Sequence, residues 1–141
     1  MKSIAKRIIC ATGFLFLSIA GYSQCDSTAT ICSKHISNGF ISDGQIYRAL
    51  LLDKEVAEFH ATFYGGSTYR IAACTGLEGK DLEFSVYDPQ HNLLFTNSEF
   101  EDSPYWDFVF DYTVNCTIEA KLGHNNSAAS GCAVMLIGFK Q

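Results

Sequence analysis

The sequence lacks the short motifs that mark common catalytic and cofactor sites. It contains no Gly-x-Ser-x-Gly nucleophile elbow, no His-Glu-x-x-His zinc motif, no phosphate-binding loop and no EF-hand loop. No two cysteines have the C-x-x-C spacing of a redox centre or zinc knuckle. A Ser-His-Asp set stays open, because its order along the chain differs between folds. These absences favour a non-catalytic binding or interaction module without a cofactor; a small secreted hydrolase is the alternative.

Basic residues are also scarce. The chain has 10 Lys and Arg against 15 Asp and Glu, a formal net charge of −5. Lys2, Lys6 and Arg7 lie at the N-terminus, so the remainder is more acidic still. An acidic protein repels phosphate backbones and anionic lipid headgroups, which makes nucleic acid and membrane surfaces poor partners. The expected partner is therefore an unidentified protein or carbohydrate.

Long apolar runs are lacking except at the N-terminus. The positive residues there precede an apolar stretch, Ile8 to Ala20, which is too short for a permanent membrane span. Gly21 and Ser23 then have the spacing that a signal peptidase reads. The sequence predicts a bacterial-type signal peptide over residues 1–23, cleaved after Ser23, and no transmembrane segment in the mature chain.

Cys25 offers a second reading of this N-terminus, because lipoprotein signals end just before a cysteine. The residue before it is Gln24, where a lipoprotein site has Gly, Ala or Ser. Secretory cleavage is therefore favoured over lipid anchoring at Cys25. We expect an exported protein, periplasmic or extracellular.

Removal of the signal would take Cys10 with it and leave an odd number of cysteines. Export to an oxidising compartment permits disulfides, and an odd count leaves at least one thiol unpaired within the chain. Cys116 and Cys132 lie near the ends of two consecutive predicted strands joined by one polar loop. The sequence therefore predicts a disulfide between Cys116 and Cys132.

Hydrophobic residues alternate with polar ones through most of the chain. Residues 24–44 are rich in Ser, Thr, Asn, Asp and Gly without any period, which predicts an irregular lead-in. Residues 45–141 hold about seven or eight short alternating segments separated by turn signals, as in an antiparallel β-sandwich or jelly roll. The clearest is 82–88, with Leu82, Phe84 and Val86 facing inward.

Three local features of this pattern lead to further structural predictions. Gln45 to Glu58 contains good helix formers, but strand is favoured because the neighbouring period is two. Gly65-Gly66 separates two alternating segments and predicts a two-residue hairpin. Cys132 to Phe139 is apolar at nearly every position, so both faces of that strand should be covered.

Several strand-like runs together resemble known proteins: Phe63–Ile71, Phe84–Asp88, Tyr105–Phe108 and Gly131–Phe139. They are similar to uncharacterised small secreted bacterial β-sandwich proteins. More distantly, they resemble the bacterial pre-peptidase C-terminal domain, a jelly-roll module appended to secreted enzymes. The similarity covers roughly residues 43–139 and implies an all-β jelly roll. It identifies no ligand residues.

Aromatic residues supply the candidate binding site. Trp106 leads an inward-facing set with Phe108 and Phe110, so we expect a core role for it. Other aromatic and charged residues fall on outward faces, where tyrosines among hydrogen-bonding groups suit sugar stacking or protein contact. The candidate binding residues are Tyr64, Arg70, Tyr87 and Asp107.

Metal sites are weaker candidates. Glu58 and His60 share a strand face and could hold two ligands of a metal, but a solvent-facing pair is favoured. The loop with Glu99, Glu101 and Asp102 could bind calcium, and a solvated acidic loop is the favoured reading. No metal site is therefore predicted.

Overall fold

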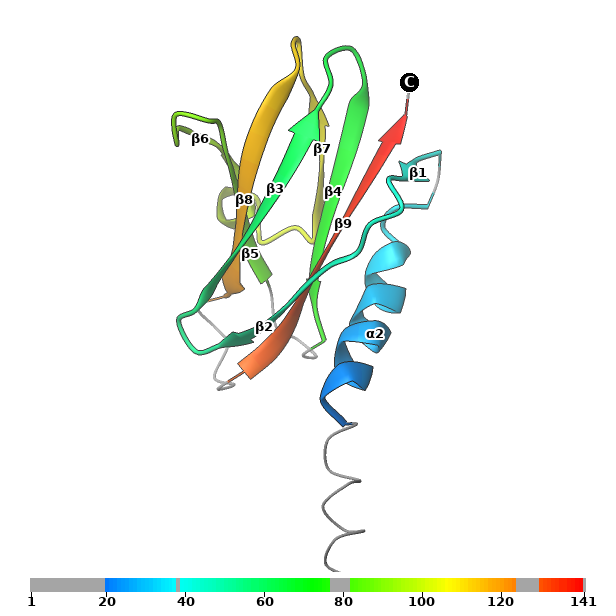
Figure 1. Ribbon diagram of the computed structural model, residues 1–141, viewed down its shortest axis with the longest axis vertical. Helices are drawn as coiled ribbons and strands as arrows, with labels where there is room; N and C mark the ends of the chain where they lie inside the picture. The colour runs from blue at the N-terminus through cyan, green and yellow to red at the C-terminus, as the bar shows by residue number, and fades with distance from the viewer. Residues whose placement is uncertain (1–19, 38, 77–81, 124–129, 141) are drawn as a thin grey trace, which may run out of the picture.

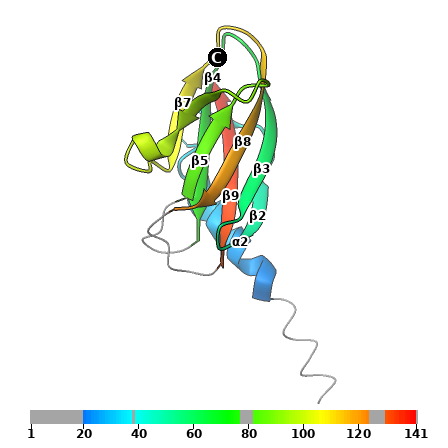
Figure 2. The same cartoon turned by 90° about the vertical axis from the view of Figure 1, so that its left-hand side faces the viewer.

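The structure is a computed structural model that describes residues 20–37, 39–76, 82–123 and 130–140, with side chains described from Cys25 onward. Two antiparallel sheets pack face to face, and one helix lies along the outside of one of them (Figure 1). In Figure 2 the sheet that contains β5 (Leu82–Tyr87) and β8 (Val114–Leu122) lies in front, with β9 (Ser130–Lys140) and helix α2 (Ala20–Ser33) behind it. This confirms the predicted all-β sandwich.

The nine strands of the described residues divide between the sheets without following chain order. Sheet A has the order β1-β9-β4-β7, and β2 also pairs with β9; sheet B has the order β3-β8-β5-β6. The strands of sheet A are β1 (Ile41–Ser42), β2 (Tyr47–Leu52), β4 (Thr68–Thr75), β7 (Tyr105–Val109) and β9 (Ser130–Lys140). Those of sheet B are β3 (Val56–Phe63), β5 (Leu82–Tyr87), β6 (Leu93–Thr96) and β8 (Val114–Leu122).

The core lies between the two sheets and follows the two-residue period of the sequence. Phe84 and Val86 on β5 and Ile118 on β8 are fully buried, as their alternation predicted. Trp106 on β7 also packs toward the core, in one ring cluster with Phe95 and Phe100, but it stays partly exposed. Its inward orientation is confirmed, and its complete burial is not.

The Gly65-Gly66 turn joins strands of different sheets, so the predicted hairpin is wrong. It connects β3, which pairs with β8, to β4, which pairs with β7 and β9. Gly66 has a φ of +86° and donates its N–H to the carbonyl oxygen of Phe110. A Cβ on Gly65 would lie 2.9 Å from the carbonyl oxygen of Asp111. The turn is glycine-rich because it packs against the β7–β8 connection.

The expected irregular lead-in of residues 24–44 is also partly wrong, because helix α2 spans Ala20–Ser33. Ala29, Cys32 and Ile36 pack against the outward side chains of β4 and β9. Helix α2 has no wide apolar face, because only a narrow stripe of small residues, Ala29 and Cys32, contacts the sheet. Tertiary contact and covalent bonds, rather than local pattern, define this helix.

Strand β9 is covered on both faces, as its continuous apolar run predicted. Its residues Ala133, Met135 and Ile137 face the core, whereas Val134 and Leu136 face α2. Beyond the helix, a Cβ at position 138 would lie 2.8 Å from Cγ2 of Ile36. Glycine at this position therefore allows the segment after α2 to cross the sheet closely.

Two disulfides fasten α2 to sheet A and correct the predicted pairing. Cys25 bonds to Cys132 on β9, and Cys32 bonds to Cys74 on β4. Cys116 is a buried free thiol on β8, and burial raises its pKa to about 11. Cys116 faces the core from sheet B, whereas Cys132 faces the helix from sheet A, so the two cannot meet. The two disulfides indicate an oxidising, extracytoplasmic environment.

Candidate functional site

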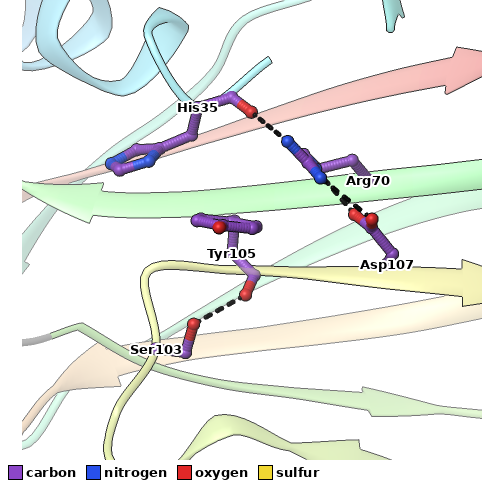
Figure 3. Close-up of polar contacts among 5 residues, drawn as sticks. All are labelled: His35, Arg70, Ser103, Tyr105 and Asp107. Carbon is purple, nitrogen blue, oxygen red and sulfur yellow. Dashed lines mark hydrogen bonds and ion pairs between the residues drawn. The ribbon is translucent and has the colours of Figure 1, made fainter. Parts of the chain in front are cut away.

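Arg70 and Asp107, two of the predicted binding residues, lie opposite each other on β4 and β7. Arg70 Nε donates to Asp107 Oδ1 over 2.6 Å, and Nη2 donates to Oδ2 over 2.9 Å (Figure 3). This two-point ion pair is the strongest geometry available to these side chains. The hydrogen bond to Asp107 raises the pKa of Arg70.

The same guanidinium is enclosed by residues that follow α2. Nη1 donates to the carbonyl oxygen of His35 over 3.1 Å, and the guanidinium carbon lies 4.3 Å from the ring centre of Phe40 and 4.5 Å from that of Tyr105. Burial and the nearby Arg70 charge lower the pKa of His35. The Arg70 side chain is only 16 % exposed. Through these contacts Arg70 connects sheet A to the segment that follows α2, and its guanidinium is not open to a ligand.

Tyr87 occupies a different part of the molecule. Its ring stacks on that of His91 at 4.4 Å, beside the β5–β6 turn. Asp88 holds that turn by accepting hydrogen bonds from the backbone N–H groups of Gln90 and Asn92 and from the Asn92 side chain. Those hydrogen bonds lower the pKa of Asp88. The four predicted binding residues therefore do not form one site.

Tyr64 borders a cleft of about 540 Å³ at one open edge of the sandwich, here called the edge cleft. Its lining combines three tyrosines with hydrogen-bonding side chains and an apolar floor. The lining residues are Asp43, Gln45, Tyr47, His60, Ala61, Thr62, Phe63, Tyr64, Ser67, Tyr69, Ile137 and Phe139. Tyr64 is 62 % exposed, whereas Phe63 beside it is fully buried. The exposure predicted for Tyr64 is confirmed.

The edge cleft is built where two consecutive strands part. Strands β2 and β3 leave their shared turn in diverging directions (Figure 1). One wall is anchored by Asp43, whose backbone N–H donates to the carbonyl oxygen of Ile137 on β9. The other is fixed by Tyr69, whose hydroxyl accepts the backbone N–H of Tyr64 over 3.0 Å. Both walls are thus held by strands of sheet A.

One acid and one phenol of the edge cleft have altered acidity. Asp43 is an exposed residue, but the nearby protein partly desolvates its carboxylate, which raises its pKa despite a hydrogen bond from the Gln45 N–H. Desolvation also raises the pKa of Tyr47, and the negative charge of Asp43 adds to this effect. Sequence reasoning missed both residues, because nothing local places residues 43–47 beside β3.

His60 lies on the rim of the edge cleft, but its ring turns to the outer face of sheet B. Its Nε2 lies 3.0 Å from Oε1 of Glu58, and its Nδ1 lies 3.4 Å from the hydroxyl of Thr117. The predicted shared face of Glu58 and His60 is confirmed. A second hollow of about 370 Å³ on this face shares residues 60–62 with the edge cleft.

The acidic loop after β6 is organised by a buried amide. Asn97 begins the short helix η1 (Asn97–Glu99) and is fully buried. Its side chain accepts the N–H of Phe84 and donates to the carbonyl oxygens of Leu82 and Ser103. Within the residues that the structure describes, no three His, Cys, Asp or Glu side chains gather as metal ligands.

Comparison with protein-family models found no match for this chain, and comparison with curated proteins found none either. The resemblance to the pre-peptidase C-terminal domain therefore stays a prediction. None of the described helices combines the length and the apolar character needed to cross a membrane.

Proposed function

We propose that this chain is a non-catalytic binding module that works outside the cytoplasm and takes its ligand in the edge cleft. The single observation that carries the proposal is the cleft itself, where Tyr47, Tyr64 and Tyr69 meet hydrogen-bonding groups above an apolar floor. A concave site with aromatic walls and a few polar groups is the usual form of a ligand site. A protein or carbohydrate ligand fits this lining.

The hydrogen bonds of His60 support binding over hydrolysis. Ser67 and His60 both line the edge cleft, so a nucleophile and a base could in principle be paired there. However, Nε2 of His60 faces Glu58 and Nδ1 faces Thr117, both on the outer face of sheet B. The imidazole is therefore directed away from Ser67, and a hydrolase remains the less favoured function.

We propose export with signal cleavage after Ser23, and the pairing of Cys25 supports the absence of a lipid anchor. A lipoprotein carries its lipid on the sulfur of the first cysteine of the mature chain. Here that sulfur is bonded to Cys132. A sulfur in a disulfide cannot also carry a thioether, so we propose a periplasmic or extracellular protein free of lipid.

A ligand screen with site variants tests the proposed function. Thermal shift against panels of oligosaccharides and peptides would find ligands, and a panel of hydrolase substrates would run beside it. Tyr64→Ala should weaken binding of any hit about tenfold or more, because the exposed ring forms one wall. The control Leu94→Ala changes a residue of similar exposure on β6, outside the cleft. Equal loss in both variants, or turnover of a substrate, would contradict the proposal.

A further inference from the structure

Strand β3 is an outer strand of sheet B, and no described strand pairs with its second edge. Of the described strands, it pairs only with β8, through eight consecutive residues without a register shift. The other outer strand of sheet B, β6, has four residues and a register shift in its pairing with β5. Proteins generally protect such edges with proline, lysine or a bulge, because an unpaired edge can pair with another chain. Strand β3 contains none of these.

The edge cleft follows this free edge. Its lining includes Ala61 and Phe63, which face the core, together with His60 and Thr62, which face outward. Successive side chains of a strand point to opposite faces, so a hollow reaches both sets where it passes around an edge. The hollow on the outer face, which shares residues 60–62, continues the same path. The free edge of β3 thus lies between two hollows that share residues 60–62.

The charge of the edge cleft favours a basic occupant. Among the described residues that line the edge cleft, Asp43 is the one carboxylate, and none is a lysine or an arginine. Partial desolvation already raises the pKa of this carboxyl, and a nearby cation would favour its charged form. Glu58 adds a second negative charge on the outer face of β3, two residues before His60.

We propose that the edge cleft binds an extended peptide segment, which adds to β3 as a further strand and places a basic side chain near Asp43. This inference rests on the proposed function and names its ligand class. Main-chain hydrogen bonds to an edge strand supply affinity in such complexes, and pockets for alternate side chains supply selectivity. Here the apolar floor with Phe63 and Phe139 would receive the inward side chains.

The probe is a random octapeptide library displayed on phage and selected on the intact, oxidised protein. The best peptide is then synthesised with a single N-methyl group at each position in turn. Strand addition uses the N–H groups of every second peptide residue, so methylation should weaken binding tenfold or more at alternate positions only. Asp43→Asn should reduce affinity for a basic peptide several-fold, and Asp53→Asn, an exposed carboxylate in the β2–β3 turn, should not.

Two results separate the inference from the function on which it rests. Peptide binding that tolerates N-methylation everywhere overturns strand addition, and binding that ignores Asp43→Asn overturns the placement of a basic side chain near Asp43. If no peptide is enriched while an oligosaccharide binds with dependence on Tyr64, the peptide inference fails and the binding function stands. If neither class binds in the edge cleft, both proposals fail.

Discussion

The guanidinium of Arg70 and the carboxylate of Asp107 meet at two points, and this pair connects three segments of the chain. The pair links β4 to β7, and the remaining nitrogen of Arg70 reaches the backbone of His35. Salt bridges on open surfaces contribute little, but the Arg70 side of this one is covered by the rings of Phe40 and Tyr105. We infer that it stabilises the docking of the segment after α2.

Arg70→Lys should lower the free energy of unfolding by about 1–3 kcal/mol, because lysine keeps the charge but loses the two-point geometry and the ring stacking. Urea unfolding followed by circular dichroism measures the change. The control is Arg48→Lys, since the Arg48–Asp26 ion pair is exposed and should contribute less than about 1 kcal/mol. Equal effects of the two substitutions would show that Arg70 has no special role.

Much of the sheet pattern could be predicted from the sequence because strand alternation is local. Phe84 and Val86 face the core as predicted. The sheet that each strand joins depends instead on contacts between distant segments. Alternation alone therefore could not show that the turn at Gly65-Gly66 passes from sheet B to sheet A.

Neither helix α2 nor the edge cleft could be predicted from the sequence, and the reason is the same. Residues 24–33 have no apolar period, and they form a helix because Ala29 and Cys32 pack against β4 and β9. Tyr64 could be identified as exposed from alternation. Asp43 and Tyr47 reach it only through the pairing of β1 and β2 with β9, which no short-range signal encodes.

Peptide mapping without reduction should recover Cys25 with Cys132 and Cys32 with Cys74. The double substitution Cys32→Ala and Cys74→Ala should cost about 3–4 kcal/mol of unfolding free energy, because that bond closes a loop between residues 42 apart in sequence. In this double variant, the backbone amide hydrogens of α2 should exchange faster than those of β8. Recovery of a peptide joining Cys116 to any other cysteine would contradict the described pairing.

Cys116 should resist alkylation in the folded protein. Burial raises the pKa of its thiol to about 11, and Asp88 adds to this effect, so little reactive thiolate forms at pH 8. Iodoacetamide at that pH should leave Cys116 unmodified in the native protein and modify it once denaturant is added. Mass spectrometry would show the difference. Rapid modification of the native protein would mean that Cys116 is accessible.

Asn97→Ala should destabilise the protein by about 3 kcal/mol. It removes three hydrogen bonds and leaves the N–H of Phe84 and the carbonyl oxygen of Leu82 buried without this partner. Thermal unfolding measures the loss. Ser98→Ala is the matched control, because the Ser98 hydroxyl bonds only to that of Thr96 among the hydrogen bonds described for it. A loss at position 98 as large as that at position 97 would contradict the structural role of Asn97.

Asp43→Asn should stabilise the protein at neutral pH and leave it unchanged in acid. The fold raises the pKa of the Asp43 carboxyl above its unfolded value, so the protonated form is favoured in the native state. The resulting stability is fully present below the unfolded pKa and is lost as pH rises through the folded pKa. Asparagine, which is never charged, avoids this loss and can still accept the N–H of residue 45. Urea midpoints at pH 3 and pH 7 test the difference, with Asp53→Asn as control. A variant that is less stable than the parent at pH 7 would show that the charged carboxylate is favoured in the edge cleft.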